Sequence, residues 1–234
     1  MNYFSIIIPC CNKADGIGRC LQSLISQTYG NFEVIVIDDG STDDSPKVIK
    51  SFLKDKRVRG YFLPKNHGRL AARNMGMRMA RNDWICWLDA DDIYLPDYLS
   101  SYDKAVSKNR DIKIFNSGML IKNKIDGWRI VEPVPESDIE NISKGRIGSG
   151  SFVFHKSLMW FFPENVKHPY GIDDTFPGML VDFDKNFEQI CKKKDGHWQP
   201  LGNPWGDDYS YFWYITRKNK TKMINSLLYV QYVR

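Results

Sequence analysis

Two carboxylates stand one residue apart at the end of an apolar run. In WICWLDADDIYLPDYL, residues 84–99, Asp89 and Asp91 directly follow the run from Trp84 to Leu88. Hard divalent cations such as Mg²⁺ and Mn²⁺ prefer oxygen ligands, often one or two carboxylates together with substrate phosphates. The pair therefore indicates a Mn²⁺ or Mg²⁺ site that a ligand diphosphate completes. The alternative is an acidic segment that stabilises the N-terminus of the following helix.

A second acidic pair follows another apolar run. VIVIDDGSTDD, residues 34–44, places Asp38 and Asp39 at the end of that run. A carboxylate at a strand end can accept the N3–H of uracil or thymine, whereas cytosine has an acceptor at that position and would be rejected. Taken alone, the segment is better explained as an ordinary turn rich in Asp, Gly and Ser.

A pair of arginines forms the third candidate group. NHGRLAARNMG, residues 66–76, places Arg69 and Arg73 one helical turn apart on one face. That face could approach a diphosphate or the base-binding carboxylate. A solvated arginine pair explains the spacing equally well.

Alternating apolar runs and helical patterns must position these groups. Residues 3–9, 32–38, 58–63 and 84–88 are typical of buried strands, and residues 17–28 and 68–80 have helical spacing. A further helix is expected from Ser45, as the cap before Pro46. The alternation predicts an α/β fold with a mostly parallel sheet and helices on both faces. In such sheets ligands bind beyond the carboxyl ends of the strands, where both acidic pairs fall.

The second half of the chain has a less regular pattern. Strand-like pieces occur within residues 112–134, and a Gly/Ser loop leads into a strand within 148–162. Residues 206–219 have helical spacing, and 226–233 form a last strand-like run. Residues 157–162 could touch a membrane surface, although core packing explains them better.

Composition narrows the class of protein. The chain has 234 residues, 42% of them apolar, and a net charge of +5, which by itself is weak support for an anionic ligand. Five cysteines without a CxxC pair suggest neither a disulfide framework nor a zinc site, and a reducing cytoplasm is the expected compartment. No apolar stretch approaches the ~18 residues of a membrane span, so any membrane contact is expected to be peripheral, on the inner face.

Four segments in this order resemble the inverting GT-A glycosyltransferases of family 2: SIIIPCCNKAD, VIVIDDGSTDD, NHGRLAARNMG and WLDADDIYLPDYL. The likeness covers roughly residues 3–120 and resumes at GDDYSYFWYITR and INSLLYVQYVR. It implies one domain with a Rossmann-like nucleotide-diphospho-sugar transferase fold and a smaller acceptor-side sheet region. Residues 1–120 would bind the nucleotide sugar, and residues 121–234 would bind the acceptor and supply the catalytic base.

The resemblance also implies roles for single residues. Asp39 would read the uracil base, Asp91 would ligate the metal, and Asp89 would lie near the ribose and the metal. Other residues would form or support the nucleotide pocket: Pro9, Cys11, Asn12 and Arg73. Cys11 stands where the family often has an aromatic residue, so stacking on the base is not expected there.

The late acidic pair carries the implied catalytic role. Asp208 would be the general base, with Asp207 beside it, and the pair Asp173-Asp174 in YGIDDTF is the competing candidate. The candidate acceptor-binding residues are Ser149, Asp207 and Trp205, whose ring could stack on a sugar or pack in the core.

The resemblance thus implies metal-dependent, inverting transfer of a sugar from a UDP-sugar to a carbohydrate or glycoconjugate acceptor, as in polysaccharide synthesis. The basic segments CKKKDGHW and TRKNKTK leave an anionic acceptor open, such as modified DNA or a teichoic-acid-like polymer, although a solvated basic face explains them better. A non-catalytic nucleotide-sugar binding protein and a nucleotidyltransferase are the remaining alternatives. The latter should have a Gly-rich phosphate loop after the first strand, and PCCNKADGIG is a poor one.

Overall fold

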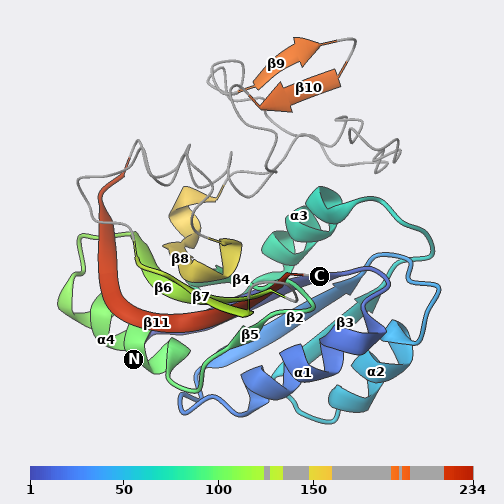
Figure 1. Ribbon diagram of the computed structural model, residues 1–234, viewed down its shortest axis with the longest axis horizontal. Coiled ribbons are helices and arrows are strands. Elements are labelled where there is room, and N and C mark those ends of the chain that lie inside the picture. Colours follow the sequence, from blue (N-terminus) through green and yellow to red (C-terminus); the bar gives the residue numbers. More distant parts are fainter. Residues whose placement is uncertain (124–126, 134–147, 160–190, 195–196, 201–218, 234) are drawn as a thin grey trace.

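Four parallel strands form the first half of the sheet (Figure 1). The computed structural model describes residues 1–123, 127–133, 148–159, 191–194, 197–200 and 219–233. The strands β1 (Phe4–Cys10), β2 (Phe32–Asp38), β3 (Val58–Phe62) and β4 (Trp84–Trp87) lie in the order β3-β2-β1-β4. Every residue of β1 and β2 is buried, as expected for parallel strands covered on both faces. The predicted parallel arrangement is confirmed.

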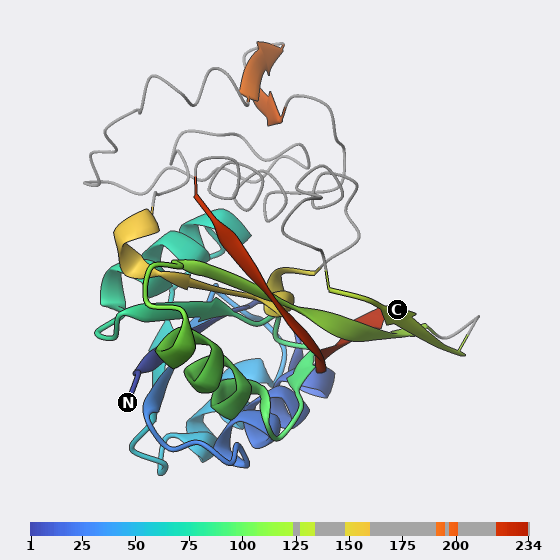
Figure 2. The ribbon, with the colours of Figure 1, turned by 90° about the vertical axis from the view of Figure 1, so that its left-hand side faces the viewer.

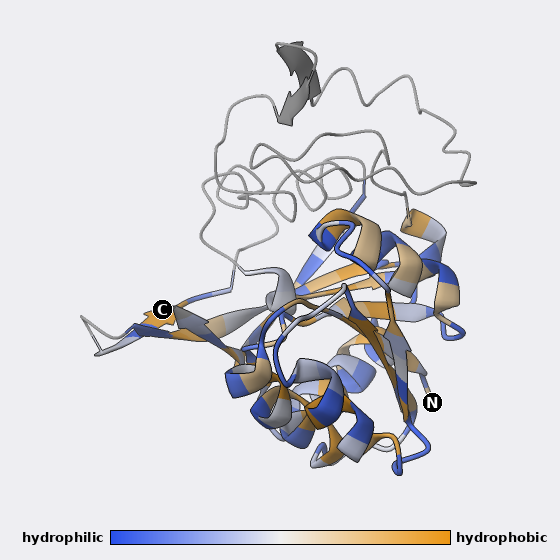
Figure 3. Cartoon of the chain, turned by 90° about the vertical axis from the view of Figure 1, so that its right-hand side faces the viewer, coloured by the Kyte–Doolittle hydropathy of each residue, from blue (hydrophilic) through white to orange (hydrophobic). Residues whose placement is uncertain are grey.

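Helices cover both faces of these strands. Successive side chains of a strand point to opposite faces, so each strand contributes to two cores. On one face Ile6 and Val34 pack in a cluster with α1 (Ala14–Ile25), α2 (Ser45–Phe52) and α4 (Tyr98–Lys108). On the other face α3 (Arg69–Met79) packs against β1 and β2 through Met77 and Ala72. Figure 3 shows the apolar residues gathered between these layers.

The sheet continues with strands from the rest of the chain. Beyond β4 the order is β8-β6-β11-β5, and β8 is antiparallel to both of its neighbours. The long strand β11 runs parallel to β6 and antiparallel to β5 (Figure 2). β7 pairs antiparallel with the later part of β6, Met119–Asn123, beyond the residues that pair with β8. These five strands span the following residues: β5 (Ile93–Tyr94), β6 (Ile114–Asn123), β7 (Gly127–Val131), β8 (Phe152–His155) and β11 (Thr221–Val233).

Strands from both sides of residue 120 therefore share one sheet, and that residue itself lies inside β6. The short 3-10 helices η1 (Ser149–Ser151) and η2 (Lys156–Leu158) flank β8. The strands β9 (Cys191–Lys194) and β10 (His197–Pro200) form a separate antiparallel pair. Within the described residues no helix is both long and apolar enough to cross a membrane.

Several expected element boundaries differ from the structure: α1 spans Ala14–Ile25 rather than 17–28, and two other differences have a clear cause. The cap position of α2 is Asp44, and Ser45 is already helical, because its hydroxyl accepts the backbone N–H of Lys13 at 2.8 Å. The last strand begins at Thr221 rather than at residue 226, since its first part pairs with β6 from Ile114 onward. The segment expected to be helical, 206–219, lies outside the described residues except for Asn219.

Candidate active site

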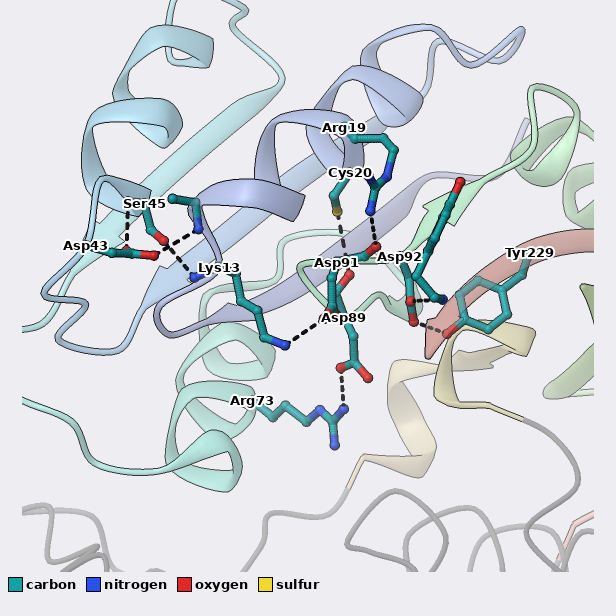
Figure 4. A network of polar contacts seen from close by, with 12 residues as sticks. Lys13, Arg19, Cys20, Asp43, Ser45, Arg73, Asp89, Asp91, Asp92 and Tyr229 are labelled. Atoms are coloured by element: carbon teal, nitrogen blue, oxygen red, sulfur yellow. Dashed lines mark hydrogen bonds and ion pairs between the residues drawn. The ribbon is translucent and has the colours of Figure 1, made fainter. Parts of the chain in front are cut away.

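The two carboxylates of the DAD segment lie beyond the carboxyl end of β4, and each contacts one cationic side chain (Figure 4). Asp89 Oδ1 accepts a hydrogen bond from Arg73 Nη2 at 2.9 Å. Asp91 Oδ2 lies 2.6 Å from the ammonium of Lys13. Arg73 comes from α3 and Lys13 from the residue before α1, so elements from both faces of the sheet meet at this turn.

Arg73 is a buried arginine, which the spacing of the two arginines in the sequence does not predict. Its side chain is 0% exposed and its guanidinium lies over the ring of Trp87, 4.8 Å from the centroid. Arg69, one turn earlier, is exposed. For Arg73 the interpretation as a solvated pair is therefore wrong, because this guanidinium is buried against β4 and holds Asp89 in place.

The start of α1 packs directly on the turn that carries the carboxylates. A Cβ atom on Gly16 would lie 2.8 Å from Asp91 Cα and 3.2 Å from the carbonyl oxygen of Ala90. Arg19 Nη2 donates to the carbonyl oxygen of Asp91 at 3.0 Å. The backbone of the turn is thereby fixed from one side by α1.

Asp92 fixes the same turn from the other side. Its Oδ1 accepts the backbone N–H of Tyr232 at 2.8 Å, and its Oδ2 accepts the hydroxyl of Tyr229. Burial, and secondarily the charge of Asp89, raise the pKa of Asp92 to about 8, against the smaller opposing effect of the two hydrogen bonds. No local sequence pattern links Asp92 to Tyr229, which lies 137 residues later in the chain.

Asp39 anchors the segment that leads into α3. Its two carboxylate oxygens accept the backbone N–H groups of His67 at 2.8 Å and Gly68 at 2.9 Å. The residue is 2% exposed, and desolvation raises the pKa of its carboxyl group while the two backbone hydrogen bonds lower it. Gly68 has a φ of 91°, which a residue with a side chain rarely adopts. Asp39 is thus a buried structural acceptor and not part of an ordinary surface turn.

The remaining residues assigned to the nucleotide pocket lie at the same edge of the sheet. Asn12 has a φ of 51°, and its Oδ1 accepts the backbone N–H of Thr42 at 2.8 Å, so it joins the loop after β1 to the loop after β2. The side-chain amide of Asn66 donates to Cys11 Sγ at 3.0 Å. Burial raises the pKa of the Cys11 thiol, which therefore stays neutral. Pro9 is buried within β1.

Ser149 is the one candidate acceptor-side residue within the described part of the chain. It lies in η1 and is 4% exposed. Its neighbour Gly150 is pressed against the ring of Tyr229, since a Cβ there would lie 2.5 Å from a ring carbon. η1 therefore adjoins the tyrosine that holds Asp92. The other candidates lie outside the described residues: Trp205, Asp207, Asp208, Asp173 and Asp174.

The donor atoms fit a hard cation that takes only part of its coordination shell from protein. Across the described ranges, no three His, Cys, Asp or Glu side chains come together as a metal cluster. Asp89 and Asp91 offer carboxylate oxygens only, which suits Mg²⁺ or Mn²⁺ when water and phosphate oxygens supply the remaining ligands. Such a cation would depend on a bound diphosphate.

Comparison with known proteins identifies relatives of the chain. Residues 5–163 match the model of the family described as "Glycosyl transferase family 2". An uncharacterized glycosyltransferase of Rickettsia felis is 32% identical over 179 residues, which is 70% of this chain and 28% of that protein. An uncharacterized glycosyltransferase of Haemophilus influenzae is 44% identical over 100 residues, 42% of this chain and 40% of that protein. The chain thus spans well under half the length of these relatives.

Solved structures show the same fold. S. aureus TarS (1-349), crystallised with UDP-GlcNAc, superposes with a TM-score of 0.66 at 20% identity, over 99% of this chain and 59% of that one. The mannosyltransferase PcManGT from Pyrobaculum calidifontis, in complex with GDP-Man and Mn²⁺, gives a TM-score of 0.54 at 21% identity, over 74% of this chain and 50% of that one. These similarities confirm the expected GT-A fold.

Proposed function

The chain belongs to glycosyl transferase family 2, and from that premise we propose that it transfers a sugar from a UDP-sugar to an acceptor hydroxyl with inversion, using a divalent cation. One observation supports this proposal most directly. Asp89 and Asp91 meet Arg73 and Lys13 beyond the carboxyl end of β4, where a parallel sheet binds its ligands. Two anions and two cations in one place suit a metal ion and a diphosphate together.

Each of these side chains has a part in the proposed reaction. Asp91 and Asp89 would hold the cation, and a bound divalent ion neutralises the charge that develops on a departing diphosphate. Arg73 orients Asp89, because its guanidinium is buried against Trp87 and cannot follow a moving carboxylate. On the acceptor side, Asp208 would take the proton of the attacking hydroxyl from the opposite face of the sugar ring. The acceptor is proposed to be a carbohydrate or glycoconjugate.

Base recognition is assigned to Asp39. A carboxylate oxygen has two lone pairs, so each oxygen of Asp39 retains one after accepting a backbone N–H. The N3–H of uracil is the donor proposed for that acceptor. Because the carboxylate is fixed by two backbone groups, the direction in which it can accept a third donor is also fixed.

Binding of UDP, CDP and GDP in the presence of Mn²⁺, measured by calorimetry, tests the assignment. One hydrogen bond to a charged acceptor contributes ~1.5–3 kcal/mol, so UDP should bind about tenfold or more tightly than CDP. Asp39→Ala should remove this preference, and Asp44→Ala, an exposed carboxylate of the same loop, should preserve it. Equal affinities of the parent protein for UDP and CDP would contradict the assignment, as would a stronger preference for GDP.

Release of UDP tests catalysis itself. The protein, incubated with Mn²⁺, a panel of UDP-sugars and carbohydrate acceptors, should release UDP in step with glycosylated product. An α-linked donor should yield a β-linked product. Binding of UDP-sugars without transfer or hydrolysis would instead support a nucleotide-sugar binding protein.

A further inference from the structure

The carboxylate assigned to the metal contacts a lysine. The ammonium of Lys13 lies 2.6 Å from Asp91 Oδ2. A divalent cation that binds Asp91 needs the electron pairs of the same carboxylate. Lys13 and the metal therefore compete for Asp91, unless the ammonium moves when the metal arrives.

The backbone of Lys13 is fixed, whereas its side chain retains freedom. Its backbone N–H donates to Ser45 Oγ at 2.8 Å, and the preceding Asn12 is held by the loop after β2. The Lys13 side chain is 33% exposed, and that of Asp91 is 15% exposed. Arg73, the other cation of the site, is fully buried and lies over Trp87. Of these two cations, Lys13 is the one that can move.

Charge balance favours such a movement. The two carboxylates and the two cationic side chains sum to zero, so the site attracts neither a metal ion alone nor a diphosphate alone strongly. A sugar nucleotide carries one negative charge on each phosphate, and a divalent ion cancels both. The site therefore stays neutral when both bind together, and every charge keeps a partner if the metal takes Asp91 and the ammonium of Lys13 turns to a phosphate oxygen.

We propose that Lys13 is an exchangeable counterion: it holds Asp91 in the unliganded protein and transfers to the donor diphosphate when the divalent cation takes its place. This inference rests on the proposed function, since it requires the metal at Asp91. It assigns Lys13 two opposing effects. The residue weakens binding of the metal alone, and it strengthens binding of the nucleotide diphosphate in the presence of metal.

Two titrations of Lys13→Met measure these opposing effects. Binding of Mn²⁺ without nucleotide, followed by the loss of the electron paramagnetic resonance signal of the free ion, should become roughly fivefold tighter, which corresponds to removal of one competing, partly exposed ion pair. Binding of UDP at saturating Mn²⁺, followed by calorimetry, should become about tenfold weaker, because a charge-assisted hydrogen bond is lost. Lys13→Gln should show the same two changes.

Lys47→Met is the matched control. Lys47 is an exposed lysine of α2 with the same charge as Lys13, and it has no part in holding the turn that carries Asp91. Its removal should leave Mn²⁺ binding within about twofold of the parent, since it is not in competition for the carboxylate. Equal tightening in both variants would overturn the proposal, because the effect would then be one of general charge.

Two further outcomes separate this inference from the function on which it rests. If Lys13→Met binds Mn²⁺ no more tightly than the parent, while the parent binds UDP in a Mn²⁺-dependent manner, the exchange is wrong and the proposed function stands. If the parent binds Mn²⁺ neither alone nor with UDP, both are wrong. Thermal unfolding of each variant checks that the native fold is retained.

Discussion

Replacing Gly16 by alanine should move the carboxylates of the site without touching their chemistry. In the parent structure the added Cβ would lie 2.8 Å from Asp91 Cα. Two carbon atoms in contact are normally ~3.5–4.0 Å apart, so the start of α1 and the turn must separate by about 0.7 Å or more. The obstructing atoms are backbone atoms held by Arg19 and by Asp92, and they cannot move as a flexible side chain would.

The change in stability caused by Gly16→Ala is the sum of two opposing effects. Alanine is preferred over glycine in a helix by ~1 kcal/mol, which favours the substitution. Overpacking of a close contact costs about 1–3 kcal/mol. Gly18 lies on the same helix, and a Cβ there would meet only the side chain of Val48 at 3.4 Å. Gly18→Ala should therefore be the more stable variant, by about 1–3 kcal/mol, or roughly 3–9 °C in Tm at about 3 °C per kcal/mol.

Thermal unfolding and Mn²⁺-dependent UDP binding, measured on both variants, check this reasoning. Gly16→Ala should lose stability relative to Gly18→Ala and should also bind UDP more weakly, because Asp91 is displaced. A Gly16→Ala variant that is as stable as Gly18→Ala, with parental UDP affinity, would show that α1 does not position the turn.

Three further substitutions test single side chains. Asp91→Asn should abolish Mn²⁺-dependent UDP binding in calorimetry while leaving Tm within a few degrees, because the residue lies at a strand end; unchanged affinity would contradict its role. Asp208→Asn should reduce turnover by about 10²–10⁴-fold while donor binding survives; if the corresponding changes in the Asp173-Asp174 pair abolish turnover and this one does not, the base lies there instead. Burial raises the pKa of Asp92 to about 8, whereas the same carboxyl group ionises at about pH 4 in the unfolded chain. Its protonated form therefore contributes stability that is fully present below about pH 4 and is lost as the pH rises through about 8. In metal-free buffer, Asp92→Asn should therefore gain of order 1–3 kcal/mol relative to the parent between pH 5 and pH 8; a gap in Tm that does not change with pH would show that Asp92 is ionised throughout.

The elements that position the site follow from local sequence. β2 occupies the same residues, 32–38, that its continuous apolar run predicts. Such a run is a local property, since a parallel strand buried on both faces needs apolar side chains at every position. The location of Asp39 and Asp89 at the ends of strands follows from the same runs, and so does the edge of the sheet at which they gather.

The partners of these residues could not be read from the sequence in the same way. The contact of Lys13 with Asp91 joins residues 78 positions apart, and that of Asp92 with Tyr229 joins residues 137 apart. β5 consists of two residues, Ile93–Tyr94, and exists only because β11 pairs with it. No periodicity marks a pairing of that kind. The cap of α2 was misplaced for a similar reason, since a distant backbone group occupies the hydroxyl of Ser45.

The position of β11 between β6 and β5 affects the order in which the chain can fold during synthesis. The strand is synthesised more than a hundred residues after β6, yet it supplies the two groups that hold Asp92. Until β11 emerges, the turn with Asp89 and Asp91 has a buried carboxyl group without its donors, and β6 has an open edge to which another chain could pair. A fragment that ends where the family match ends, at residue 163, should therefore aggregate or bind no metal, although it contains Asp89 and Asp91. Pairing over so long a separation is slow, so the half of the sequence that is proposed to bind the nucleotide is translated early and completed last.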